Sequence, residues 1–175
     1  MDFLLPTSRR RALFGGALCL AAWTACAATP TDERLLGLAE QDVVVALPDV
    51  KKLARPAIGP HGLRGLLTLA HSDTTTLSGE LTFYFRKSLL ERIEERKRLP
   101  EPQCKGAYST LLASLSTRYG TGIYSDGDNA NASQNGSAAW VLDNFKVMAY
   151  RMQGVNQCDL LVAIEQLAQR DAAEL

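Results

Sequence analysis

Apolar residues recur at helical spacing in two parts of the chain. The clearer part follows Pro102, where one face carries apolar side chains at i, i+3, i+4, i+7 and i+11: Tyr108, Leu111, Leu112, Leu115 and Tyr119. Gly120 stands where the C-terminal cap of such a helix is expected. A shorter helix is predicted over 38–47, because an apolar segment there stops before Pro48, which cannot continue a helix.

Short apolar runs predict three strands in each half of the chain. Their ranges are 65–70, 81–85 and 89–99 in the first half, and 138–142, 145–152 and 158–167 in the second. The range 89–99 is rich in Glu and Arg, which favour a helix. It also follows the strand 81–85 across a short turn, so we interpret it as the second strand of a hairpin with a charged, solvated outer face.

Turn-forming residues separate these elements. Residues 55–62 contain two Pro and two Gly and are expected to form a loop, as are the Thr- and Ser-rich residues 71–79. The polar stretch 125–137 predicts a flexible connection. Its Asp and Asn residues lack the spacing of a calcium-binding loop.

The order of these elements predicts an α+β fold made of two helix-β-β-β units in tandem. The units are residues 35–99 and 104–167, with the helices packed on one face of an antiparallel sheet. A similar alternation of helices and strands also arises by chance in small α+β domains, without an internal repeat. In either case 35–167 forms a single domain, preceded by a polar lead at 28–34 and followed by a polar tail at 168–175.

The first 27 residues have the parts of a signal peptide. Arg9, Arg10 and Arg11 precede a short apolar run, and Ala25-Cys26-Ala27 supplies a small-x-small cleavage signature. The run is shorter than the roughly 20 residues that a membrane-spanning helix needs. We therefore expect a periplasmic protein, exported by the general secretory or the twin-arginine route. The alternative to a signal peptide is that the apolar run forms a buried N-terminal helix of the folded protein.

The residues Trp23-Thr24-Ala25-Cys26 offer a second cleavage scheme, because they resemble a lipobox. Lipidation of Cys26 would anchor the chain and make it an outer-membrane lipoprotein. The sequence leaves the soluble and the anchored alternatives open.

Cys104 and Cys158 remain under either cleavage scheme. An even pair of cysteines in an oxidising compartment predicts a disulfide, which would contribute about 4 kcal/mol by loop closure. Two buried thiols, or half of a metal site, are the alternatives, although no zinc spacing is present. We expect neither a metal nor another cofactor.

The overall charge is balanced, with 19 basic and 19 acidic residues. Removal of the signal peptide takes away three arginines and one aspartate, which leaves a slightly acidic protein. A protein that binds nucleic acid normally carries a basic surplus. We therefore expect no nucleic-acid partner.

Short motifs in the first half resemble the small envelope lipoproteins of the SmpA/OmlA type. The motifs are Leu36-Gly37-Leu38-Ala39-Glu40-Gln41-Asp42-Val43, Leu47-Pro48, and Gly62-Leu63-Arg64-Gly65 followed by an aromatic strand. The tandem order of elements is similar to the β-lactamase-inhibitor-protein-like fold, which is built from two such units. Over roughly 35–165, this resemblance implies an envelope-assembly module or an inhibitor of a secreted enzyme.

The histidines His61 and His71 do not predict a catalytic site. His61 lies among Pro and Gly, and His71 precedes Ser72-Asp73, whereas a catalytic triad is a spatial rather than a sequential arrangement. The chain also lacks the nucleophile-elbow motif. We expect a protein that is not an enzyme, with an envelope hydrolase of unrecognised site as an alternative.

The sheet face that the helices leave uncovered is the expected binding surface. In a strand, Tyr84 points away from Phe83 and Phe85, so it is assigned to this face, where an aromatic side chain can anchor a partner. Arg86 and Arg151, which end corresponding strands of the two halves, are assigned to the same face. The sequence therefore predicts an envelope protein that binds an unidentified protein partner there. An inhibitor would instead use the loop 125–137.

Overall fold

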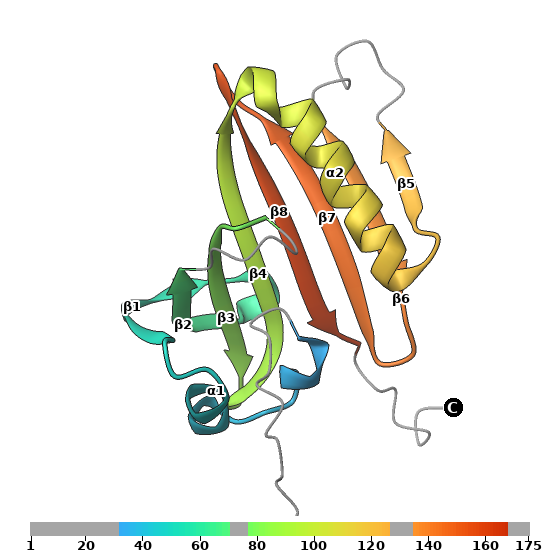
Figure 1. The fold of residues 1–175 in the computed structure, drawn as a ribbon. Helices are drawn as coiled ribbons and strands as arrows, with labels where there is room; N and C mark the ends of the chain where they lie inside the picture. Colours follow the sequence, from blue (N-terminus) through green and yellow to red (C-terminus); the bar gives the residue numbers. More distant parts are fainter. Residues whose placement is uncertain (1–31, 71–76, 127–134, 168–175) are drawn as a thin grey trace, which may run out of the picture.

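The computed structural model describes residues 32–70, 77–126 and 135–167, and the strands within them form one antiparallel sheet (Figure 1). In chain order the strands are β1 (Lys51–Ile58), β2 (Arg64–Ala70), β3 (Glu80–Arg86), β4 (Leu89–Pro100), β5 (Ile123–Asp126), β6 (Gly136–Val141), β7 (Phe145–Gln153) and β8 (Gln157–Gln166). Their order across the sheet is β1-β2-β3-β4-β8-β7-β6-β5. The centre is therefore the β4–β8 pair, and the edges are β1 and β5.

Both α-helices lie on one face of the sheet, which we call the covered face. The helical elements are η1 (Glu33–Leu35), α1 (Glu40–Ala46), η2 (Pro60–Gly62) and α2 (Glu101–Tyr119). Val43 of α1 belongs to one apolar cluster with Phe83, and Leu111 of α2 belongs to another with Ile164. Phe83 and Ile164 both lie opposite Ile93 of β4, so the two clusters share a face. Figure 1 shows α2 crossing in front of β7 and β6, and α1 beside the lower ends of β3 and β4.

The predicted long helix is confirmed as α2. Its buried residues fall on one side at helical spacing: Cys104, Tyr108, Leu111 and Leu115. Pro102 in the first turn costs no hydrogen bond, because the first N–H groups of a helix have no partner within it. The helix ends at Gly120, whose φ of 83° few other residues adopt readily. The helix predicted over 38–47 is likewise confirmed as α1.

The predicted fold of two helix-β-β-β units in tandem is wrong. Each α-helix is followed by four strands, and the two sets join at β4 and β8 into a single sheet. The pattern missed the edge strands β1 and β5. β1 contains Pro56, which an edge strand accepts because its outer side needs no ladder hydrogen bonds. β5 has four residues and overlaps the range 125–137 that was expected to be a loop.

The hairpin interpretation of 89–99 is confirmed by β4. Lys87 and Ser88 form the turn, with φ values of 48° and 69°, as in a two-residue hairpin loop. β4 pairs with β3 on one side and with β8 on the other. These pairings outweigh the helical preference of its Glu and Arg residues, since strand formation depends mainly on packing context.

A buried carboxylate holds the chain just before β3 against the covered face. Glu95 is 1 % exposed and lies opposite Val162. Its Oε1 accepts hydrogen bonds from the backbone N–H groups of Leu77 and Gly79, both at 3.2 Å, and no described residue is a partner of Oε2. A Cβ on Gly79 would lie 2.3 Å from the carbonyl oxygen of Arg96, so this approach requires glycine.

The predicted disulfide between Cys104 and Cys158 is confirmed. Their Cα atoms are 6.1 Å apart, and both residues are buried. The bond joins the first turn of α2 to the start of β8, where Cys158 lies opposite Leu99. It therefore fixes the helix to the central strand pair.

Removing this disulfide should destabilise the fold. We expect the double variant Cys104→Ala and Cys158→Ala to lose about 4 kcal/mol of unfolding free energy, because the unfolded chain regains the entropy of an open loop. Urea denaturation measures this loss. With dithiothreitol present the wild type and the variant should converge; a difference that persists would instead implicate packing at the two sites.

Glu95 should stabilise the fold through its acceptor oxygen. Glu95→Leu keeps an apolar side chain of similar size but leaves two buried N–H groups unpaired, so we expect a loss of about 2–4 kcal/mol. Glu95→Gln retains a carbonyl acceptor and should lose less. Both are measured by chemical denaturation. Equal stability of the Leu variant and the wild type would show that these hydrogen bonds do not hold the segment.

Candidate functional site on the open face

The sheet face opposite the two α-helices, which we call the open face, is the candidate functional site. Successive side chains of a strand point to opposite faces, so the neighbours of covered-face residues lie on the open face. Glu94 of β4, Ala163 of β8 and Met148 of β7 lie opposite one another and mark this face. One part of it is charged and the other is apolar.

The charged part begins with a closed network around Arg92 of β4. The guanidinium of Arg92 contacts Glu94 at 2.6 Å and Glu165 of β8 at 2.7 Å, and Glu165 contacts Lys146 of β7 at 3.5 Å. The Arg92 side chain is 8 % exposed, and the two carboxylates are nearly as well covered. Two cations and two carboxylates therefore balance where little solvent reaches them.

Further along β4 the charges are exposed. Arg96 donates a hydrogen bond to Asp159 of β8 at 2.8 Å, and Arg98 donates to the other carboxylate oxygen at 3.1 Å. The two arginine side chains are 54 and 59 % exposed, against 19 % for Asp159. The hydrogen bond from Arg96, supported by that from Arg98, holds the pKa of Asp159 below its usual range. Two cations share this one carboxylate, and Glu80 of β3 lies opposite Arg96, so the charges at this end are close to balanced while both guanidinium groups remain exposed.

Apolar side chains continue the open face across β8, β7, β6 and β5. We call this surface the apolar patch, and its residues are Leu161, Met148, Tyr150, Met152, Ala139, Val141 and Ile123. Ile123 and Val141 are 73 and 68 % exposed, and Met152 is also exposed. Exposed apolar residues that adjoin one another in this way are typical of interaction sites.

Tyr84 lies on the open face, as predicted, but it is buried. Its ring packs so closely on Gly59 that a Cβ there would lie 2.5 Å from Cδ1, and Gly65 is nearly as close. Burial, together with the charge and hydrogen bond of Glu94, raises the pKa of Tyr84 to about 12. The ring is therefore covered by Gly59 and Gly65 and does not present an exposed anchor.

The two predicted arginines do not join Tyr84 in one site. Arg86 ends β3 and pairs with Glu91 at 2.9 Å. Arg151 lies opposite Leu160 on the covered face, with its guanidinium 5.4 Å from the ring centroid of Tyr108. From the sequence, Arg96 and Arg98 were expected only as part of a charged, solvated strand face, and Asp159 was not identified. Six of the seven residues 92–98 are charged, but the partner strand of this face cannot be identified without the fold.

Other candidate residues lie apart from this face or outside the described residues. His61 is exposed in η2, with a φ of 53°. His71, Cys26, the predicted signal peptide 1–27 and residues 127–134 of the expected loop are outside the described residues. Within 32–70, 77–126 and 135–167, the structure contains no group of three His, Cys, Asp or Glu residues placed to hold a metal ion.

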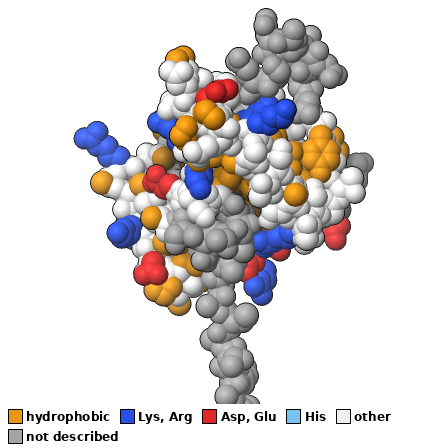
Figure 2. Space-filling model, turned by 45° about the horizontal axis from the view of Figure 1, so that its top comes forward, with side chains coloured by type: hydrophobic (Ala, Val, Ile, Leu, Met, Phe, Trp, Pro, Cys, Tyr) orange, Lys and Arg blue, Asp and Glu red, His pale blue; other side chains and the backbone are white. Residues whose placement is uncertain are grey.

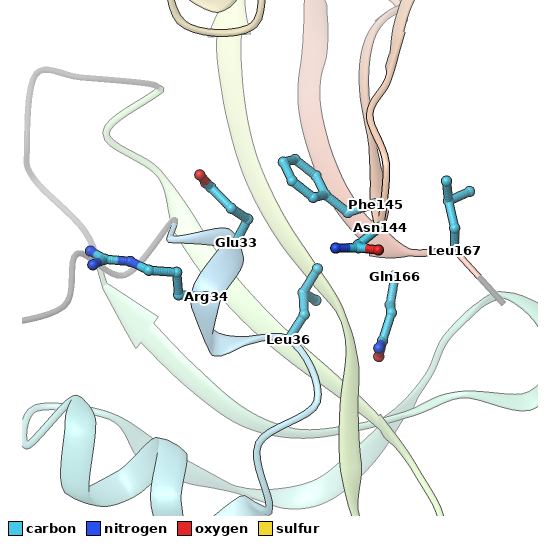
Figure 3. Close-up of a pocket in the computed structure, with 7 residues that line it drawn as sticks. All are labelled: Glu33, Arg34, Leu36, Asn144, Phe145, Gln166 and Leu167. Carbon is cyan, nitrogen blue, oxygen red and sulfur yellow. The ribbon is translucent and has the colours of Figure 1, made fainter. Parts of the chain in front are cut away.

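A cavity of about 370 Å³ lies between η1 and the ends of β7 and β8 (Figure 3). It is lined by Glu33, Arg34, Leu36, Asn144, Phe145, Gln166 and Leu167. Figure 3 shows Arg34 pointing away from the other side chains. Glu33 is bound by Arg118 of α2 at 2.6 Å. This ion pair joins η1 to α2, so the Glu33 carboxylate in the cavity lining already has a cationic partner.

The surface in Figure 2 intersperses acidic, basic and apolar side chains, with no broad region of one sign among the described residues in view. Within the described part of the chain, no helix is both long enough and apolar enough to cross a membrane. The open face combines two exposed arginines with an adjoining apolar patch, and these residues make it the candidate site.

Asp159 should stabilise the fold at neutral pH and lose this effect in acid. Its folded pKa lies below the ordinary 3.8, so its contribution is complete above that value and disappears as the pH falls through the lower folded pKa. Asp159→Asn should lose about 1 kcal/mol at pH 7 and progressively less in more acidic solution. Denaturation across pH 2–7 measures this. The exposed turn variant Asp143→Asn is the control, and an equal loss at every pH would contradict the expectation.

Comparisons of the chain with protein-family models, curated proteins and solved structures found no match. The resemblance to SmpA/OmlA-type lipoproteins therefore stays a prediction from short sequence motifs, and the function must be argued from the site itself.

Proposed function

We propose that this chain is a non-enzymatic protein of the bacterial envelope that binds a protein partner through the open face. The apolar patch carries the proposal. Its residues come from four neighbouring strands, so they form a rigid surface that loses little conformational entropy on binding. Both α-helices lie on the other face, which leaves this surface accessible.

The composition of the open face supports a protein partner. Interfaces between proteins combine an apolar centre with a polar rim and are enriched in Tyr, Met and Arg. Tyr150 and Met152 lie within the apolar patch, and Arg96 and Arg98 lie at its border. This arrangement matches an interface better than it matches a site for a reaction.

The export of the chain is supported by its disulfide. Disulfides persist in oxidising compartments and are rare in the cytosol, and Cys104 and Cys158 form one. We place the mature chain in the periplasm, because residues 1–27 have the pattern of a signal peptide. Acylated Cys26 would instead anchor the same domain to a membrane, with its open face still available to a partner.

Site-specific crosslinking in the producing cell tests this proposal. A photoreactive amino acid replaces Val141 or Met152 in the full chain, and in a control it replaces Ser109, an exposed residue of α2. We expect protein adducts of discrete mass from the two open-face positions and none from Ser109, because the partner covers only the open face. Adducts that form from Ser109 alone, or from no position, would contradict the proposal.

A further inference from the structure

We infer that the partner presents an aspartate or glutamate carboxylate beside apolar side chains, and that Arg96 and Arg98 receive this carboxylate. The inference rests on the proposed function and specifies the chemistry of the surface that binds there. It is carried by two exposed guanidinium groups that share a single directly paired carboxylate at one end of the open face.

Arg96 and Arg98 are held in place by a single acid. They lie two residues apart on β4 and therefore point to the same face. Each donates to a different oxygen of Asp159, at 2.8 and 3.1 Å. Asp159 thus orients both guanidinium groups before any partner arrives, which lowers the entropy lost on binding.

Both guanidinium groups keep donors for a further acid. A guanidinium has five N–H donors, and the bond to Asp159 uses one from each arginine. Both side chains are more than half exposed. A planar guanidinium matches a carboxylate with two parallel hydrogen bonds, so one carboxylate from a partner can accept hydrogen bonds from the donors that Asp159 leaves unused.

The apolar patch directly adjoins these donors. Across the sheet, Arg96 lies opposite Leu161, which lies opposite Tyr150, and Asp159 lies opposite Met152. Neighbouring strands are about 4.8 Å apart, so an acid bound by the arginines has apolar contacts within one or two residues. A polypeptide segment with an acidic residue next to aliphatic residues meets both requirements.

A protein carboxylate fits this site better than an anionic membrane surface. The arginines border the apolar patch on one side, and carboxylates lie close by on the same face: Glu80, Glu94 and Glu165. A membrane surface would bring many negative charges against these acids at once. A single carboxylate can contact Arg96 and Arg98 while it avoids the neighbouring acids.

The test repeats crosslinking from Met152 in the full chain in cells. We expect Arg98→Gln to reduce the yield of protein adduct at short irradiation about tenfold. The loss of one hydrogen bond to a charged group weakens binding by about this factor. Arg96 remains to pair Asp159, and urea denaturation of the purified variant checks that the fold is intact. Arg98→Lys keeps the charge without the planar donors and should give an intermediate yield. Lys105→Gln, an exposed cation of α2, is the control and should change nothing.

The outcomes separate this inference from the proposed function. An undiminished protein adduct in Arg98→Gln would overturn the inference and leave the proposed function standing. A wild type without any protein adduct would overturn the proposed function. A lipid adduct, or Arg98-dependent sedimentation of the purified protein with phosphatidylglycerol vesicles but not with phosphatidylcholine vesicles, would overturn the inference by assigning the anion to a lipid headgroup.

Discussion

The pairing of β4 with β8 is the constraint on which the rest of the structure depends. Nine residue pairs, from Arg92–Glu165 to Pro100–Gln157, join the first half of the chain to the second. Without this ladder the halves would each expose a sheet edge, which favours aggregation. The disulfide strengthens the same junction, because Cys158 begins β8 and Cys104 lies in the helix that leaves β4. A single sheet with two helices on one face follows from this pairing.

The same pairing determines which side chains share a face. Residues of β4 alternate between Ile93 and Glu95 on the covered face and Glu94, Arg96 and Arg98 on the open face. Glu95 is a fully buried carboxylate on the mostly apolar covered face, and its hydrogen bonds to the segment before β3 account for a carboxylate there. The open face tolerates the charges because they are paired: Arg92 with Glu94 and Glu165, and Arg96 and Arg98 with Asp159.

Local pattern was sufficient to predict the elements with many buried residues, and insufficient for the rest. The helix α2 and the β3–β4 hairpin bury one side each, so their periodicity is visible in the sequence. The edge strands β1 and β5 bury few apolar residues and carry turn-forming residues, so they resemble loops. The alternation of side chains along a strand correctly predicted which face Tyr84 lies on. Its burial depends on Gly59, which lies outside β3, between β1 and η2. The face of Arg151 requires the register with β8, which no local pattern supplies.

The charges of the open face change from largely buried to exposed along one strand. Near Arg92, two cations meet two carboxylates, and Arg92, Glu94 and Glu165 are largely buried. Burial makes an unpaired charge costly, so this end must be neutral for the fold to be stable. Near Arg98, solvent reaches the side chains, and an incompletely paired cation costs little. Stability thus requires close charge pairing at one end and leaves exposed arginine donors at the other, and the exposed apolar patch adjoins that end.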